Sequence, residues 1–159
     1  FDVVPYGTEA LGVMRIEKGH AAGNELNGQT TARDLGMGAL VSTKKDSIGA
    51  VLSRRKGLNL DGGYSLVGFK PVNREDTLAA GSHIFSEGAK VNAKFDQGYL
   101  TSTAYSPILE SSIAIGFLKK GSQRKGEHVR IINLLANSNI KAEVVSAHFV
   151  DPEGEKLRG

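Results

Sequence analysis

Two ionisable side chains of opposite charge, Arg15 and Glu17, lie in a stretch whose apolar residues recur at helical spacing. Because they are two positions apart, their side chains leave the helix in roughly opposite directions and cannot hold one ligand group together. Glu17 lies on the apolar stripe of Val13 and Met14, so we expect it to be the more buried of the two. A buried carboxylate needs hydrogen-bond donors, which either a structural ion pair or a ligand with paired N–H groups would supply.

The basic residues offer a second kind of chemistry, the binding of anions. The chain has 20 Lys and Arg against 17 Asp and Glu, a net charge of +3, and a sequence pI of about 9.2. These cations are scattered except at 43–45, 53–56 and 119–125, a pattern typical of solvated faces and helix ends. A duplex-binding protein needs a denser patch, so we expect no nucleic-acid partner, and a small polyanion is the alternative ligand.

The sequence lacks the residues that several kinds of reactive site require. The chain contains no nucleotide-phosphate loop, paired-His zinc motif or nucleophile elbow. With no Cys it can form no disulfide, Cys-based zinc site or thiol nucleophile, and no apolar run approaches the length of a membrane span. We therefore expect no catalytic residue, no metal site, no membrane partner and a cytoplasmic location. The four His lie far apart in the sequence: His20, His83, His128 and His148.

The period of the apolar residues changes near residue 60, which divides the chain in two. Residues from about 7 to 18 predict a helix that ends at Gly19, and Asp46 caps a second helix over about 47 to 56. The run 59–63, Asn-Leu-Asp-Gly-Gly, has the composition of a linker. We therefore expect a first unit over 1–57 and a second over 58–159.

The second unit reads as a series of short strands separated by Gly, Asn and Pro. Ile113, Ile115 and Phe117 share one face of such a strand, and so do Val129 and Ile131. Strands at this regular spacing argue for a six-stranded antiparallel barrel, jelly-roll-like in character. Together with the helices of the first unit, the fold class is α+β. The expected strands span residues 64–70, 83–86, 99–105, 112–118, 127–135 and 141–150.

The stretch 5–19, Pro-Tyr-Gly-Thr-Glu-Ala-Leu-Gly-Val-Met-Arg-Ile-Glu-Lys-Gly, resembles the signature helix of the glycine-cleavage aminomethyltransferase family, which carries Arg-x-Glu near a closing Gly. Similar blocks follow in the family's order at 30–38, 44–49, 101–116 and 148–154. The form Tyr-Gly-Thr-Glu-Ala-Leu is similar to one branch of the family, the α subunits of heterotetrameric sarcosine oxidases. The resemblance covers nearly the whole chain.

This resemblance implies a fold and a ligand. Members of the family have a mixed α/β core that binds tetrahydrofolate, followed by a six-stranded barrel, so 1–57 would be the end of that core. The resemblance implies that Glu17 and His20 meet one edge of the pterin, with the structural ion pair as the alternative for Glu17. Arg15 and Lys45 would be distant charges for the glutamate tail. Leu11 stands where the family has a folate-binding Arg.

The oxidase branch implies an activity for a longer parent protein, of which this chain would be the C-terminal fragment. The parent would oxidise sarcosine to glycine and transfer the one-carbon unit to tetrahydrofolate, with flavin and NAD bound in its other parts. The implied partners are the remainder of the α subunit, the other oxidase subunits and folate. The family's catalytic acid lies upstream, so we expect the fragment to require no cofactor and to be inactive. The alternatives are the corresponding part of an aminomethyltransferase or a dimethylglycine oxidase, and a non-catalytic folate-fold interaction module.

Overall fold

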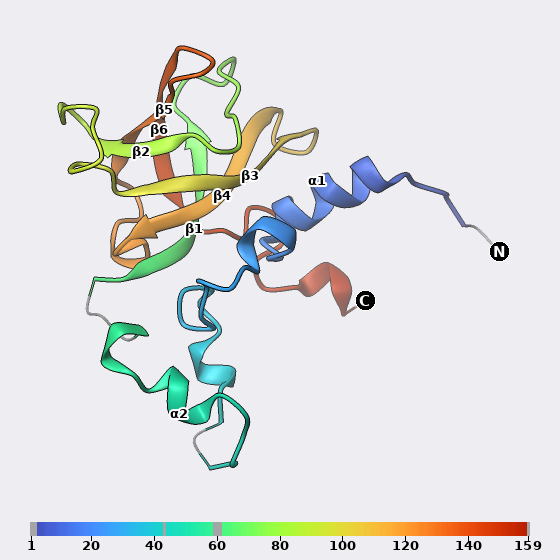
Figure 1. The fold of residues 1–159 in the computed structure, drawn as a ribbon. Coiled ribbons are helices and arrows are strands. Elements are labelled where there is room, and N and C mark those ends of the chain that lie inside the picture. Colours follow the sequence, from blue (N-terminus) through green and yellow to red (C-terminus); the bar gives the residue numbers. More distant parts are fainter. Residues whose placement is uncertain (1–2, 43, 59–61, 159) are drawn as a thin grey trace.

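The computed structural model describes residues 3–42, 44–58 and 62–158, and its centre is a β-barrel that follows the first helices (Figure 1). Of the predicted linker, residues 59–61 lie outside the described part of the chain. The helices are α1 (Thr8–Lys18) and α2 (Ala50–Ser53), with 3₁₀ turns η1 (Gly23–Glu25), η2 (Gly38–Leu40), η3 (Lys56–Leu58), η4 (Gly121–Gln123) and η5 (Glu155–Leu157). The strands are β1 (Tyr64–Pro71), β2 (His83–Ser86), β3 (Gly98–Ser106), β4 (Ser111–Lys119), β5 (His128–Asn133) and β6 (Ser138–Val145).

The strands are all antiparallel and close on themselves in the order β1-β4-β3-β2-β5-β6. Closure comes from β1, which pairs with β4 on one side and with β6 on the other. A closed barrel leaves no sheet edge exposed, so the chain needs no other device against edge-to-edge pairing. The prediction of a six-stranded antiparallel barrel is confirmed, and its form is one closed barrel.

Alternate strand residues fill the barrel interior, as the period of two predicts. Phe69 and Leu118 are fully buried there, and each such side chain stabilises the fold by about 2 kcal/mol through its removal from water. The β1–β2 loop adds Leu78, whose N–H donates to the Ser112 hydroxyl at 3.1 Å. The other interior residues are Val67, Ile84, Leu100, Ala114, Val129, Ile131, Ala142 and Val144.

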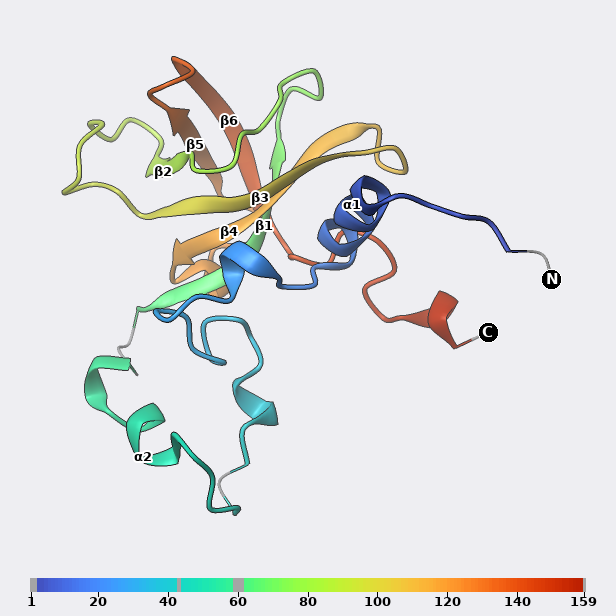
Figure 2. The same ribbon diagram turned by 45° about the vertical axis from the view of Figure 1, so that its right-hand side comes forward.

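The outer face of β4 is buried as well, because α1 covers it. Every residue from Ser111 to Leu118 is buried. Ala114 belongs to the interior cluster, whereas Ile113 and Ile115 belong to an outer cluster with Ile16 of α1. A strand covered on both faces reads as a nearly continuous apolar run, which is how β4 looks in the sequence. Helix and barrel therefore share one packed layer (Figure 2).

One extra residue in β3, Thr101, redirects the rest of that strand. Ser102 lies opposite the outward-facing Ile115, and the register shifts immediately before it. In an unbroken ladder Ser102 would lie opposite Ala114 and face the barrel interior. A bulge of this kind re-aims the side chains that follow it. Ser102 and Ser106 therefore face α1 and not the barrel interior.

The last strand is shorter than predicted and begins earlier. Residues 141–150 are the expected strand, but β6 spans Ser138–Val145. Residues 146–158, which we call the C-terminal segment, leave the barrel and run beside α1 (Figure 1). The reason is a competing set of partners, because the N–H groups of Phe149 and Val150 donate to the Glu17 carbonyl at 2.8 and 3.0 Å.

The C-terminal segment also makes a charged contact with α1. The Lys18 ammonium lies 3.1 Å from the Asp151 carboxylate and donates as well to the Asp151 carbonyl. His148 Nδ1 donates to the Lys18 carbonyl at 2.8 Å, since a carbonyl oxygen can only accept. Carbonyls in the last turn of a helix have no partner within the helix. The C-terminal segment supplies partners for two of them.

The sequence predicts a second helix over 47–56 capped by Asp46, and the structure corrects this. Only Ala50–Ser53 is helical, and the residue before it is Gly49. Residues 38–42 and 44–58, which we call the arm, project from the barrel (Figure 2), and almost all of them are exposed. A short helix without tertiary packing is marginal in water. The arm exposes several apolar side chains: Leu40, Val41, Ile48, Val51, Leu52 and Leu58.

Gly19 and Gly36 provide a matched test of the packing at the end of α1. Both have φ of 75°, so an Ala at either position carries a left-handed backbone cost of about 1 kcal/mol. At Gly19 the added Cβ would also lie 2.5 Å from the Ala147 carbonyl oxygen, whereas at Gly36 it would meet none of the described residues within 4 Å. We expect Gly19→Ala to lower the unfolding free energy by roughly 3 kcal/mol and Gly36→Ala by about 1 kcal/mol in urea titrations. Equal losses would contradict close packing of the C-terminal segment on α1.

Candidate functional site

A network of charges and hydroxyls joins α1, η1 and β3. Arg15 Nη1 lies 3.0 Å from Glu25 Oε2, and Arg15 Nη2 donates to Ser102 Oγ at 2.8 Å. The Ser102 hydroxyl donates in turn to Glu25 Oε1 at 2.6 Å, and the Ala22 N–H donates to Glu25 Oε2 at 2.9 Å. The Glu25 side chain is 0% exposed. Both of its oxygens have donors, which is the condition for keeping a charge buried.

Two opposing effects act on the pKa of Glu25. Burial raises it, whereas hydrogen bonds from Ser102, Thr101 and the Ala22 N–H, together with the charge of Arg15, lower it. The lowering effects prevail, so the pKa of Glu25 lies below its ordinary value and the carboxylate is ionised at neutral pH. An ionised, fully buried carboxylate at this position holds α1 to the bulged strand β3.

Glu17 is also buried, with 5% of its surface exposed, as the helical stripe predicts. Its Oε1 accepts a hydrogen bond of 2.5 Å from the Ser106 hydroxyl. In the part of the chain that the structure describes, Glu17 forms no ion pair, and the ion pair of Arg15 is with Glu25. A carboxylate has about four acceptor positions. With one hydroxyl donor, Glu17 keeps capacity for further N–H groups.

The other predicted folate residues do not gather around Glu17. His20 follows the end of α1 with an exposed side chain, and its carbonyl accepts from Arg15 Nη1 at 3.4 Å. Lys45 belongs to residues 44–49, at the end of the arm that lies away from α1 (Figure 2). The structure thus brings Arg15, Glu17 and His20 to one end of α1 and leaves Lys45 apart from them. Leu11, in the position of the family's Arg, is 52% exposed.

The sequence analysis missed Glu25, Ser102 and Ser106. Glu25 lies ten residues after Arg15 in a polar, turn-rich stretch, so helical spacing could not pair the two. Ser102 and Ser106 belong to a strand predicted by alternation, which assigns faces only while the register is unbroken. The one available signal is the run Thr101–Thr103, three small polar residues in a strand whose neighbours are apolar.

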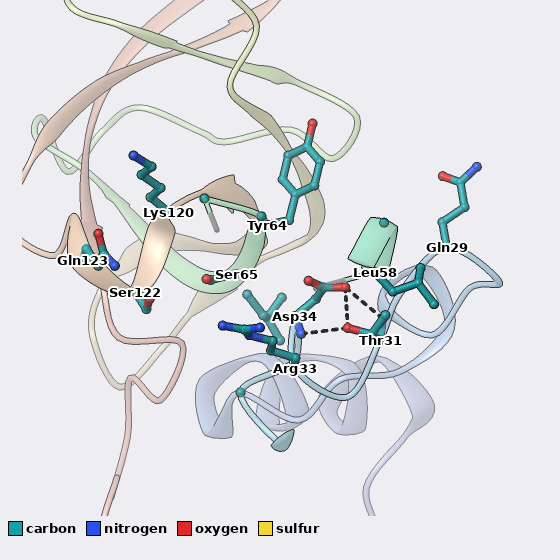
Figure 3. A pocket seen from close by; sticks show the side chains of 15 residues that line it. Gln29, Thr31, Arg33, Asp34, Leu58, Tyr64, Ser65, Lys120, Ser122 and Gln123 are labelled. Atoms are coloured by element: carbon teal, nitrogen blue, oxygen red, sulfur yellow. Dashed lines mark hydrogen bonds between the residues drawn. The ribbon is translucent and has the colours of Figure 1, made fainter. Parts of the chain in front are cut away.

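A cavity of about 650 Å³ lies between the start of β1, η4 and the turn around residues 31–36 (Figure 3). Asp34 Oδ2 accepts from the Thr31 N–H at 2.9 Å and from its hydroxyl at 2.8 Å. The Asp34 carbonyl accepts from the Leu66 N–H at 2.7 Å, which ties the turn to β1. The polar groups of Asp34 thus hold the turn in place. None of the four predicted folate residues lines this cavity.

Over the described ranges, 3–42, 44–58 and 62–158, no group of three or more His, Asp or Glu lies close enough to hold a metal ion. None of the helices in those ranges has the length and apolar composition that crossing a membrane requires. His83 has a partner of its own, with its Nδ1 2.6 Å from Asp96 Oδ2.

Residues 65–151, from β1 into the C-terminal segment, match the family of the glycine cleavage T-protein C-terminal barrel domain. The chain belongs to this family. A solved structure agrees, since aminomethyltransferase T of the glycine cleavage system from Bartonella henselae superposes with a TM-score of 0.74. That superposition covers 92% of this chain and 39% of the other at 23% identity, and it shows a shared fold.

Longer relatives contain the T-protein barrel together with the helix before it. Sarcosine oxidase subunit alpha of Rhizobium meliloti (strain 1021) is 40% identical over 156 residues, which are 98% of this chain and 16% of the relative. The same subunit of Corynebacterium sp. (strain P-1) is 33% identical over 100% of this chain and 16% of its own length. Aminomethyltransferase of Halothermothrix orenii is 31% identical over 93% of this chain and 39% of its own length. The chain thus spans about one sixth of the length of the oxidase subunits.

Glu25→Gln should remove a pH-dependent part of the stability. The amide keeps the shape but leaves Arg15 without its anion, so we expect a loss of roughly 3 kcal/mol in unfolding free energy at neutral pH. Because the folded-state pKa of Glu25 is lowered, its contribution is present above the ordinary value of 4.5 and is lost as pH falls through the lowered value. Denaturant titrations of the two proteins should therefore converge in acid.

The matched control is Glu153→Gln, which neutralises an exposed carboxylate. It should change the unfolding free energy by less than about 0.5 kcal/mol at any pH. If Glu25→Gln behaved like this control, or kept its full loss in acid, the network would not rest on an ionised Glu25.

Proposed function

We propose that the chain is the C-terminal part of the α subunit of a sarcosine oxidase. The complete enzyme would oxidise sarcosine, with a flavin bound in another part of it supplying the two-electron chemistry and O₂ as the acceptor that becomes peroxide. The one-carbon unit then moves to tetrahydrofolate, which becomes methylenetetrahydrofolate as glycine leaves, and NAD is bound elsewhere. The similarity of 98% of this chain to the Rhizobium meliloti subunit at 40% identity supports this assignment.

In this proposal the chain forms one wall of the folate chamber, and the observation that carries it is Glu17. Glu17 is buried, it sits on the Arg-x-Glu helix, and its described donor is one hydroxyl, that of Ser106. The amide and amine edge of a pterin presents two N–H donors side by side, which suits a carboxylate oxygen pair. His20, exposed next to the helix end, is the second side chain on that side of the ligand.

Arg15 and Lys45 have different parts in this proposal. Arg15 is held by Glu25 and Ser102, so it acts as a positioning residue that fixes the angle of α1 on the barrel. Lys45 is carried by the arm, and it contributes charge toward the glutamate tail only when the arm packs on another part of the protein. The catalytic acid and the flavin lie outside this chain. The isolated chain is therefore inactive, with tetrahydrofolate binding weak or absent.

The arm supplies the contact with the remainder of the α subunit. Its apolar side chains are largely solvated in this chain, with Ile48 109% and Val51 79% exposed. Exposed apolar surface of this extent marks a contact surface. The Lys and Arg beside it, at 44–45 and 54–56, would favour an acidic rim on the covering part. The arm thus connects the barrel to the folate core and, through it, to the other subunits.

A second candidate is the same part of an aminomethyltransferase, which the 31% identity to the Halothermothrix orenii enzyme favours. Leu11 argues for the oxidase instead, because the transferases carry Arg there and an apolar residue removes a charge-assisted contact to folate. The corresponding part of a dimethylglycine oxidase and a non-catalytic folate-fold interaction module are the remaining alternatives. All of them share the barrel and differ in the polypeptide that precedes it.

Glu17→Gln in the complete oxidase tests the proposal. Sarcosine-dependent peroxide formation should stay the same, because the flavin site is elsewhere. The KM for tetrahydrofolate should rise about tenfold, which is the loss of one charge-assisted hydrogen bond. Peroxide is measured by a coupled assay and methylenetetrahydrofolate by chromatography. Glu75→Gln, an exposed carboxylate in the β1–β2 loop, is the control and should change neither.

The two parts of the proposal fail in different ways. If the complete protein produced no peroxide from sarcosine, the assignment to an oxidase would be wrong. If peroxide formed normally and Glu17→Gln left the folate kinetics unchanged, Glu17 would be a structural residue and the pterin contact would lie elsewhere.

A further inference from the structure

A second cavity, of about 530 Å³, lies beside the β2–β3 loop and the turn between β4 and β5. None of the predicted folate residues lines it. It is the part of the barrel surface where positive charges converge, since Lys94, Lys119, Lys120 and Arg124 all line it. A concave site lined by charges of one sign concentrates ligands of the other sign.

The acidic residues of this cavity are already engaged. Arg124 Nε and Nη2 donate to Glu127 at 2.7 and 2.6 Å, so those two charges cancel. Asp96 accepts from the Gly98 N–H at 3.0 Å and lies 2.6 Å from His83 Nδ1. The cavity is therefore lined by four cations and two carboxylates, which leaves it a net positive charge.

The lysines have no carboxylate partner among the described residues. Lys119 Nζ donates to the Asp96 carbonyl at 2.9 Å and lies 5.9 Å from the centre of the Tyr64 ring. Lys94 Nζ lies 5.7 Å from the centre of the Phe95 ring. Carbonyl and ring contacts orient an ammonium group and leave its net charge uncompensated. The cavity thus holds in place more positive charges than its two carboxylates offset.

Lys120 adds a second and independent observation. It adopts a left-handed backbone, with φ of 55° and ψ of 25°, where Gly is the residue free of strain. Its N–H donates to the Gly63 carbonyl at 2.9 Å, which fixes the turn. Figure 3 shows its side chain extending away from Arg33 and Asp34. A cation placed at a strained position that lines the cavity indicates a use for the side chain.

Gln97 supplies a neutral polar group in the same wall. Its Oε1 is buried without a hydrogen-bond partner among the described residues, while its Nε2 donates to Ser86 Oγ at 2.8 Å. Rotating this amide by half a turn would let the Ser86 hydroxyl donate to Oε1 and would place an N–H group where the unpaired acceptor now lies. The Gln97 and Ser86 pair thus adds a neutral polar wall to the cavity and no charge.

We infer that this cavity binds a small anion with at least two negative charges, of phosphate or carboxylate chemistry. The lysine ammonium groups supply both the attraction and the hydrogen-bond donors, as in other sites that bind anions. A site of this size, about 530 Å³, suits a diphosphate or a tricarboxylate. The site is separate from the folate wall, so it stands whether or not the proposed function holds.

The test is a titration of the ¹⁵N-labelled chain with pyrophosphate, followed by NMR at constant ionic strength, with citrate as a second arm. We expect saturable shifts of Gly98, Lys120 and the Gln97 side-chain amide, with a dissociation constant below about 1 mM. Tighter binding of pyrophosphate would identify a phosphate site, and tighter binding of citrate a carboxylate site. Shifts that do not saturate with either anion would overturn the inference.

Three variants distinguish binding in this cavity from general electrostatic attraction to the positively charged chain. Lys119→Gln and Lys120→Gly should each weaken binding about fivefold, as the loss of one close charge predicts. Lys156→Gln removes the same charge from η5 and should leave binding unchanged. Lys120→Gly also relieves the left-handed strain, so its thermal stability should not fall, which excludes unfolding as the cause. Equal binding by all three variants would overturn the inference.

Discussion

The carboxylate of Glu25 has no contact with solvent, and this constraint decides how α1 sits on the barrel. A buried charge is stable only where donors surround it, and the donors here come from three separate elements. Arg15 reaches it from α1, the Ala22 N–H from the residues before η1, and Ser102 from β3. If any of these elements moved, a charge would be left unpaired in the interior. The network therefore selects one arrangement of helix and barrel, which apolar packing alone would leave less defined.

The bulge at Thr101 allows β3 to contribute Ser102 to the network around Glu25. It moves Ser102 from the interior to the outer face, and Ser106 moves with it toward Glu17. The same outer face carries the apolar contacts between Ile16 and β4, so polar and apolar contacts lie in one layer. The C-terminal segment completes that layer by binding the last turn of α1. The helix that carries Arg15 and Glu17 is thus fixed on two sides, as a site that must hold a ligand requires.

Much of this fold follows from local patterns in the sequence. Alternation locates every strand of the barrel, because each strand has one face in the interior, and Gly19 marks the end of α1 by its backbone freedom. The conformations of the arm and the C-terminal segment cannot be predicted from local sequence patterns. They depend on tertiary contacts, which intrinsic propensity does not describe. The site follows in part: Glu17 is buried as predicted, although Met14 of the predicted apolar stripe is 43% exposed. The pairing of Arg15 with Glu25 joins a helix to a turn ten residues away, and the contact of Ser102 depends on the bulge. The sequence pattern reveals neither.

If Glu25 fixes α1 to the barrel, helix and barrel should open together. Native-state hydrogen exchange measures this directly, by comparing the opening free energy of amides in the last turn of α1 with that of amides in the centre of β4. The account predicts equal opening free energies for Ile16 and Ile115, both close to the global unfolding free energy. An opening free energy for Ile16 several kcal/mol below that of Ile115 would show that α1 detaches on its own, and would contradict the account.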